Sequence, residues 1–330
     1  MPVQTLYFYK YMLKYYFLVL PTMPIEEPEQ IAEGPSRRKF LEWIGLGTVA
    51  AAVGGFSGRV EAQVPSRPTY AQLKKALEGR GLHVENGESL AGEGDFKEFR
   101  IIDKGDKLFA KMISLEEKGN GYFDLIICEG THPEDFATRA KRYEKENPGT
   151  QVVLQVAGTF TSTDDKPNGS VLHRGAEVGW STPNARYGGV VTLGPEGEPQ
   201  VLSKSEFDPN KVGNKDAFQT FTLVEEGVSQ HFKDTSLFTR RALIQRDFID
   251  AVGSPQKQWA ILETEVPMQL TDFALFLKDC LGVKNAALLD TGAWSTGWLK
   301  QADGKTQQLL PDGRREATHF TTLLVGVSKN

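Results

Sequence analysis

Short apolar runs separated by turn residues fill most of the chain after residue 95, and they predict β-strands. Residues 99–102, 108–113 and 122–128 are each bounded by Gly, Asp or Lys, which is typical of a strand meander. The same pattern predicts further strands, in the regions 151–156, 187–202, 217–224, 240–249, 258–266 and 284–289.

Two longer segments place apolar residues at three- to four-residue spacing, which predicts helices with one apolar face. One covers residues 133–146. The other covers residues 271–281, where Thr271 is positioned to cap the first turn and Gly282 to end the helix. A shorter helix is expected over residues 70–78. Because each long helix has a single apolar stripe, we expect both to cover sheets.

This mixture of elements predicts an α+β fold, in which mixed β-sheets are covered by a few helices in a single domain at residues 96–330. Residues 63–95 are expected to form a linker and the short helix. The chain shows no repeat with a period of about 20–50 residues, which excludes solenoids and propellers.

The first part of the chain has the features of an export signal. Arg37 and Arg38 stand before a weakly apolar run at 43–58 that is rich in Gly and Ala, and residues 60–62 form a small-residue cleavage site. We therefore expect a twin-arginine signal peptide at residues 23–62, membrane contact only during export, and a periplasmic or extracellular mature protein. The alternative is that the arginine pair caps a buried helix.

Residues 1–22 precede this signal and are rich in aromatic side chains. Their apolar stretch is interrupted by Lys10 and Lys14 and is shorter than the roughly 20 apolar residues that span a bilayer. Met23 begins an acidic, polar stretch suited to the start of a signal peptide, so we expect residues 1–22 to be a misassigned extension. The alternative is an additional segment on the membrane surface.

Composition narrows the classes of function. The 330 residues carry a net charge of −5, with 25% charged and 39% hydrophobic residues, as in an ordinary globular protein. No basic cluster suited to a nucleic acid backbone is present, so nucleic acid is not an expected partner.

The metal-binding residue types form no recognisable pattern. Cys128 and Cys280 match no zinc-ligand spacing, and we expect them either as buried apolar residues or as one disulfide. The five histidines are scattered. The sequence therefore predicts no metal site and assigns no cofactor.

Five short elements follow one another between residues 99 and 298. They are residues 157–160 (AGTF), 167–169 (PNG), 219–227 (QTFTLVEEG), Arg240 or Arg241 before an apolar strand, and 289–295 (LDTGAWS). Their order and spacing resemble the phosphodiester glycosidase family (N-acetylglucosamine-1-phosphodiester alpha-N-acetylglucosaminidase-like). Three positions depart from that family's pattern: Val156 stands where Asn is usual, Thr291 replaces a Gly, and Trp294 replaces the first Ser.

The resemblance implies roles for particular residues. Asp290 would supply carboxylate chemistry at the anomeric carbon, and Arg240 a planar fork for the phosphate. The small residues of the motifs would leave room for a ligand beside the backbone. If these segments form a site, they must converge on one pocket. The implied substrate-binding residues are Gly158, Arg241, Gly292, Trp294 and Ser295. Alternatively, Arg240 and Asp290 only pair with each other or cap turns.

Further polar and aromatic residues allow two interpretations each. Glu263 and Glu265 are secondary acid/base candidates, but their alternation with apolar residues indicates a solvated strand face. Trp294 and Trp298 either stack on a sugar ring or lie in the core.

The sequence therefore supports two hypotheses of function. In the first, an exported hydrolase cleaves a sugar from a glycosyl phosphodiester of an envelope or extracellular glycan. In the second, the same fold serves a non-catalytic carbohydrate- or envelope-binding protein, which the departures at Val156, Thr291 and Trp294 favour. Both hypotheses expect a glycan or a sugar phosphate as the ligand.

Overall fold

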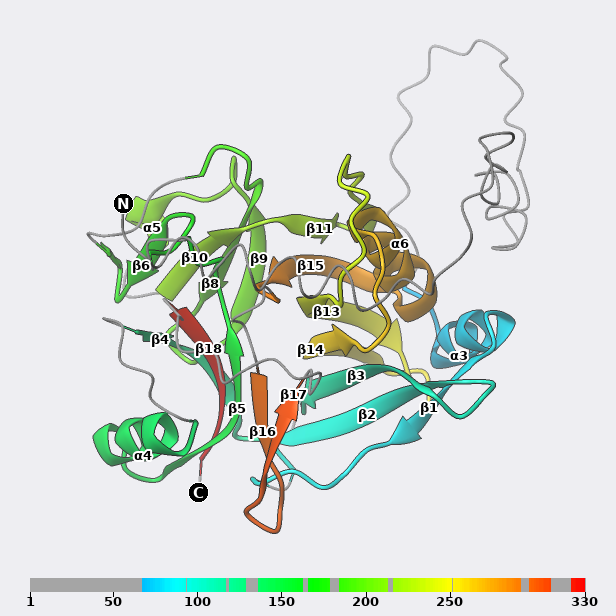
Figure 1. Ribbon diagram of the computed structural model, residues 1–330, viewed down its shortest axis with the longest axis horizontal. Helices are drawn as coiled ribbons and strands as arrows, with labels where there is room; N and C mark the ends of the chain where they lie inside the picture. The colour runs from blue at the N-terminus through cyan, green and yellow to red at the C-terminus, as the bar shows by residue number, and fades with distance from the viewer. Residues whose placement is uncertain are drawn as a thin grey trace, which may run out of the picture. The chain divides into compact units, whose positions relative to one another are not determined.

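The computed structural model describes residues 67–329, except for residues 93, 117–118, 129–135, 163–165, 179–183, 213–215, 251, 292–296 and 310–321. The predicted signal peptide at 23–62 and the segment 1–22 lie outside the described residues. Within the described part, antiparallel strands predominate and form three sheets (Figure 1).

The largest sheet has eight strands in the order β1-β2-β3-β14-β13-β15-β11-β12. Its strands are β1 (Leu82–Asn86), β2 (Phe96–Asp103), β3 (Leu108–Leu115), β11 (Thr222–Glu225), β12 (Val228–Ser229), β13 (Arg241–Ile249), β14 (Pro255–Thr264) and β15 (Val283–Leu289).

Two five-stranded sheets complete the β-structure, in the orders β7-β6-β10-β8-β9 and β17-β16-β5-β18-β4. Their strands are β4 (Tyr122–Ile127), β5 (Thr150–Ala157), β6 (Val171–His173), β7 (Ala176–Glu177), β8 (Gly189–Leu193), β9 (Pro199–Ser203), β10 (Asp216–Thr220), β16 (Gly297–Lys300), β17 (Thr306–Leu309) and β18 (Thr322–Lys329).

Every region predicted to be extended contains a strand, and the expected mixture of sheets and helices is present, though β-structure dominates. The sequence analysis did not predict β1, β7, β12 or β16–β18. The helices are α3 (Tyr70–Gly79), α4 (Phe136–Glu146), α5 (Pro209–Val212) and α6 (Leu270–Leu281). None of the helices in the described part of the chain has the length and apolar character needed to cross a membrane.

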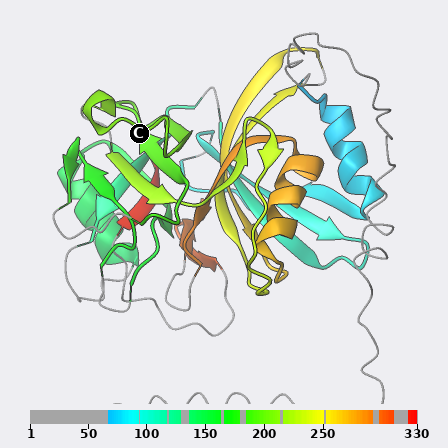
Figure 2. The same ribbon diagram turned by 90° about the horizontal axis from the view of Figure 1, so that it is seen from above.

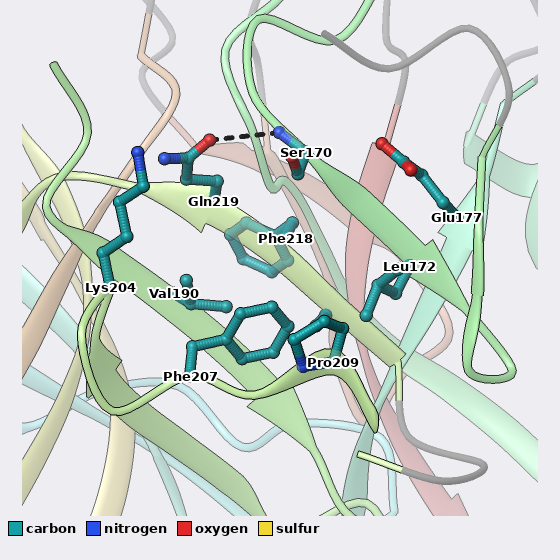
Figure 3. A pocket seen from close by; sticks show the side chains of 10 residues that line it. Ser170, Leu172, Glu177, Val190, Lys204, Phe207, Pro209, Phe218 and Gln219 are labelled. Carbon is teal, nitrogen blue, oxygen red and sulfur yellow. Dashed lines mark hydrogen bonds between the residues drawn. The ribbon is translucent and has the colours of Figure 1, made fainter. Parts of the chain in front are cut away.

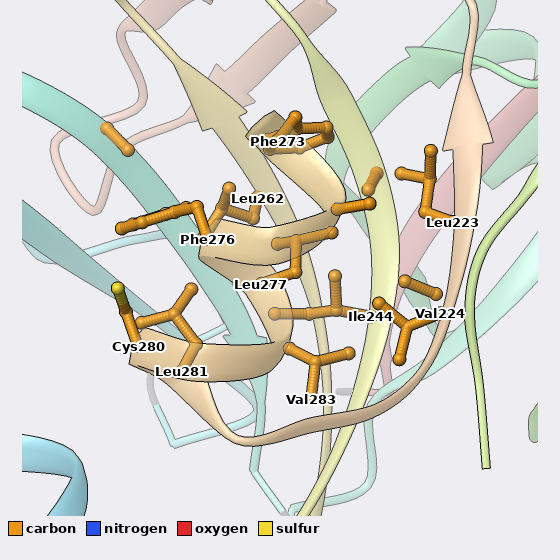
Figure 4. Close-up of a cluster of buried hydrophobic side chains, with 14 of the residues drawn as sticks. Leu223, Val224, Ile244, Leu262, Phe273, Phe276, Leu277, Cys280, Leu281 and Val283 are labelled. Atoms are coloured by element: carbon orange, nitrogen blue, oxygen red, sulfur yellow. The ribbon is translucent and has the colours of Figure 1, made fainter. Parts of the chain in front are cut away.

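Both faces of the eight-stranded sheet are covered. On one face, α6 buries Phe273, Phe276 and Leu277 against Ile244 and Leu262 (Figure 4). The other face packs against the five-stranded sheets, so that the helix α6 and the green strands lie on opposite sides of the eight-stranded sheet (Figure 2). Because successive residues of a strand point to opposite faces, every second side chain enters the core under α6 and the others enter the core between the sheets.

The ends of α6 agree only in part with the sequence pattern. Gly282 ends the helix in the left-handed conformation with φ 61°, as predicted. The prediction that Thr271 caps the start is wrong, because the N-cap residue is Gln269 and it makes no side-chain capping bond. The Thr271 hydroxyl instead accepts a hydrogen bond from Phe232 N and donates one to Phe232 O, which fixes the segment after β12 to the helix.

The cysteines follow the first of the two expectations. Cys280 is fully buried under α6, whereas Cys128 follows β4 and packs with a different apolar cluster. No disulfide joins these two described residues. Burial raises the pKa of the Cys280 thiol to about 12, so this thiol is protonated and unreactive at neutral pH.

The turn after α6 gives a test of the fold. An alanine Cβ at Gly282 would lie 2.6 Å from Leu73 Cδ2 and 2.8 Å from Pro68 Cγ, in addition to the left-handed backbone. We expect Gly282→Ala to lower the free energy of unfolding by about 1–2 kcal/mol for the backbone alone and by a further ~1–3 kcal/mol for overpacking. Gly304→Ala is the matched control, because Gly304 has φ 82° but open space around it. Equal losses in urea-induced unfolding of the two variants would contradict the packing of α6 against α3.

Candidate functional site

Segments that lie far apart in the sequence meet at the end of β15. Asp290, the first residue after this strand, donates its backbone N–H to Gly158 O at 3.3 Å, and its own carbonyl accepts a bond from Arg241 Nη1 at 3.2 Å. Asp290 is 8% exposed. These two bonds therefore hold together the end of β5, the end of β15 and the start of β13, next to the Asp290 carboxylate.

Gly158 does not leave space for a ligand. An added Cβ would lie 2.9 Å from Thr322 Oγ1 and 3.6 Å from the Phe218 ring, so both neighbours occupy the room that a side chain would take. Thr322 Oγ1 also accepts a hydrogen bond from Thr159 N. The expectation that this glycine opens the backbone to substrate is wrong, and its role is close packing between strands.

Arg241 forms a fully buried ion pair with Glu263. Both side chains are 0% exposed, and Arg241 Nε donates to Glu263 Oε2 at 2.6 Å across the β13–β14 ladder. The expectation that Glu263 belongs to a solvated strand face is therefore wrong. The guanidinium fits here because the strand that covers it begins with Gly297, whose Cβ would lie 3.1 Å from Arg241 Nη2.

The ion pair continues into a row of buried charges on the same face of the sheet. Lys111 is the cross-strand neighbour of Glu263 and is 6% exposed. Glu98, on the next strand, is 3% exposed. Burial raises the pKa of the Glu98 carboxyl, and the charge of Lys111 opposes this shift. Opposite charges thus alternate across β13, β14, β3 and β2, which reduces the electrostatic cost of burying them.

Arg240 points to the opposite face from Arg241. Arg241 pairs with Leu289 across the β13–β15 ladder, and the residues next to this pair are Arg240 on one strand and Asp290 on the other. Just beyond them, Thr291 Oγ1 donates to Thr239 O. Alternation therefore places Arg240 and Asp290 on the same face, as cross-strand neighbours.

The Arg240 guanidinium itself turns toward the segment before β13. Its Nε donates to Met268 O at 3.1 Å, its Nη2 donates to Ser236 O at 2.9 Å, and it lies 5.2 Å from the centre of the Phe238 ring. These contacts hold the Arg240 guanidinium against the segment before β13.

A group of four aromatic side chains surrounds the Asp290 end of the site. The ring centroids of Phe160 and Tyr187 are 5.6 Å apart, those of Tyr187 and Phe221 4.5 Å, and those of Phe221 and Phe232 6.1 Å. The charge of Asp290 acts on the Tyr187 hydroxyl. The sequence analysis included Phe160 and Phe221 in motifs but missed Tyr187 and Phe232, which come from separate loops and show no spacing that would connect them.

Gln219 holds this aromatic group in place. Its amide nitrogen donates to Tyr187 O at 3.0 Å and to Asn184 O at 2.7 Å, while its amide oxygen accepts from Ser170 N and Asn184 N. All the hydrogen-bonding groups of the amide are thereby used. Two of the sequence elements, 167–169 and 219–227, thus meet beside Tyr187.

The family profile of phosphodiester glycosidases matches residues 150–324. The chain belongs to this family. Two solved structures are similar to the chain at low identity. One is the catalytic domain of zebrafish N-acetylglucosamine-1-phosphodiester alpha-N-acetylglucosaminidase, auto-inhibited by its pro-peptide, with 15% identity, a TM-score of 0.46, and coverage of 79% of this chain and 94% of that one. The other is a hypothetical protein from Synechocystis, with 9% identity, a TM-score of 0.43, and coverage of 72% and 63%. A comparison with curated protein sequences found no significant match.

The positions that depart from the phosphodiester glycosidase pattern can be placed in part. Val156 is fully buried in the core between the sheets, where an amide would need a hydrogen-bond partner. Thr291 donates to Thr239 O. Gly292, Trp294 and Ser295 lie outside the described residues.

Trp298 lies in the core, which is the second of the two interpretations given for it above. It is 6% exposed in an apolar cluster, with the Arg139 guanidinium 5.3 Å from its ring centre, so it is a core residue.

The described residues of this phosphodiester glycosidase contain no group of His, Cys, Asp or Glu side chains suited to a metal ion. A separate cavity of about 230 Å³ lies on the outer face of the β6–β10–β8 sheet (Figure 3). Its floor is apolar, Lys204 and Glu177 stand at its rim, and Asp290 does not line it. It shares Gln219 with the Asp290 site, where that side chain bonds to the backbone of Asn184 and to Tyr187 O.

The buried ion pair gives the second test. Glu263→Gln removes one charge and leaves Arg241 buried without its counterion, which we expect to lower the free energy of unfolding by about 3–5 kcal/mol. Asp303→Asn is the control: Asp303 pairs with Lys305 at 2.6 Å, but both side chains are largely exposed, so its loss has little effect. A Glu263→Gln protein as stable as the parent in urea would contradict a structural role for the pair.

Proposed function

We propose that this phosphodiester glycosidase hydrolyses the bond between a sugar and a phosphodiester group of an envelope or extracellular glycan. The observation that carries the proposal is the placement of Asp290, a largely buried carboxylate at a strand exit. Its backbone N–H bonds to Gly158 O, its carbonyl accepts from the Arg241 side chain, and Arg240 is its neighbour across the ladder. A carboxylate beside the anomeric carbon is one of the groups that glycosidases ordinarily use.

The reaction follows from the chemistry of the leaving group. Water adds to the anomeric carbon, the bond from that carbon to the phosphate oxygen breaks, and the electron pair leaves with the phosphate monoester. A phosphate leaves as a stable anion, so no acid has to protonate it. One carboxylate therefore suffices, with Asp290 either taking the proton of the water or stabilising positive charge on the sugar.

Arg240 is suited to the phosphate. Its Nε and one Nη2 hydrogen are used by Met268 O and Ser236 O, which leaves the Nη1 group for an anion. Because both bonds are to fixed backbone carbonyls, the planar fork is oriented before substrate binds.

The third test compares two variants at this carboxylate and cation. We expect Asp290→Asn to lower kcat by about 10²–10⁴-fold, because the amide keeps the shape but not the basicity. Arg240→Lys should raise KM, since Lys keeps the charge but loses the fork. The measurement is release of sugar from a panel of sugar 1-phosphodiesters, with and without divalent cations. Full activity of Asp290→Asn would contradict the proposal.

A second function, non-catalytic binding of a carbohydrate or envelope polymer, is favoured by one observation. The position where the family usually has Asn is Val156, and its side chain is fully buried in an apolar core. In that case the same panel would bind to the purified protein and no sugar would be released.

We also propose that the protein is exported through the twin-arginine route and acts in the periplasm or outside the cell. Arg37, Arg38 and the apolar run that follows them support this proposal. The fourth test replaces both arginines by lysine, which keeps the charge. We expect the precursor of this double variant to remain uncut in the cytoplasm, and cell fractionation with immunoblotting measures this. Unchanged export would remove the proposal.

A further inference from the structure

Tyr187 combines deep burial with an unused hydroxyl. The residue is 5% exposed, and its ring packs against both Phe160 and Phe221, which also contact each other. Its phenolic oxygen makes no hydrogen bond to any residue in the described part of the chain, although its own backbone carbonyl accepts one from Gln219. Because this oxygen is not among the fully buried polar atoms that lack a partner, it is within reach of a bound ligand.

The surroundings of this hydroxyl define what it can do. Burial, and secondarily the negative charge of Asp290, raise the pKa of Tyr187 to about 12. The phenol is therefore protonated at neutral pH and is able to donate a hydrogen bond. Its position is fixed, because Gly169 allows the ring to approach closely and the Gln219 amide bonds to the backbone of Asn184 and of Tyr187.

We infer that Tyr187 is a sugar-binding residue of the Asp290 site, whose hydroxyl donates a hydrogen bond to an oxygen of the glycosyl group. The inference rests on the proposed function. Phe160 and Phe221, which are both partly exposed, flank the phenol and offer apolar ring faces to the C–H groups of a pyranose. The negative charge of Asp290 disfavours a phosphate at this position, so the phosphate belongs beside Arg240 and the sugar beside Tyr187.

The fifth test removes only the hydroxyl. In Tyr187→Phe we expect the affinity for N-acetyl-α-D-glucosamine 1-phosphate or α-D-glucose 1-phosphate, measured by titration calorimetry, to fall about 5- to 10-fold, the loss of one hydrogen bond. KM for a sugar phosphodiester should rise by a similar factor with kcat less affected. Tyr70→Phe is the matched control, because Tyr70 is 52% exposed on α3, and it should bind like the parent.

Thermal unfolding separates binding from structure. Because the Tyr187 hydroxyl has no partner within the described protein, Tyr187→Phe should keep or raise the Tm, whereas loss of a structural hydrogen bond would lower it. A lowered Tm with unchanged affinity would assign the hydroxyl a structural role and overturn the inference.

The remaining outcomes distinguish this inference from the proposed function. If the parent protein binds the sugar phosphates and releases no sugar from any phosphodiester, hydrolysis fails, but a weaker affinity of Tyr187→Phe still supports the sugar site. If the parent releases sugar and Tyr187→Phe matches it in affinity and KM, the inference fails and hydrolysis stands. A parent that binds neither probe and releases no sugar overturns both.

Discussion

The buried ion pair between Arg241 and Glu263 is the constraint on which the architecture around Asp290 depends. Two unit charges without exposure are tolerated only with close, hydrogen-bonded geometry, here 2.6 Å between Nε and Oε2. The second bond from Arg241, to Asp290 O, carries this constraint to the end of β15. The Arg241 guanidinium, held in place by Glu263, thus fixes the backbone of Asp290.

Neighbouring arginines serve different purposes because a strand alternates its faces. Arg241 points into the core between the sheets and fixes the backbone of Asp290, whereas Arg240 points to the face of α6 and bonds to Met268 O and Ser236 O. A pattern of two consecutive arginines does not reveal which of them has which task, since that depends on the register of β13 with β14 and β15.

Local patterns were sufficient for most of the fold. Apolar periodicity located α6 and the longer strands between β2 and β15 because each buries a regular face, and Gly282 marked a helix end through its backbone freedom. Glu263 was misjudged because alternation shows that a residue shares a face, but not whether that face meets water or another sheet. The strands after residue 296 were missed: β16 and β17 are only four residues long, and β18 was overlooked although residues 323–327 form an apolar run. Tyr187 could not be found, because its importance arises from Gln219, Phe221 and Asp290, which reach it only through the tertiary fold.

Whether the site catalyses or only binds depends on what the departures remove. An Asn at position 156 would point into the core beside Gly297, where Val156 Cγ1 would lie 2.9 Å from an added Cβ, so its replacement by Val exchanges a polar contact for packing and leaves Asp290 in place. By strand alternation, Arg240 and Asp290 lie on the α6 face of the eight-stranded sheet, whereas Val156 comes from β5 of another sheet and fills the core between the sheets. The loss of an amide at position 156 therefore changes the packing behind Asp290 and leaves the groups beside it unaltered.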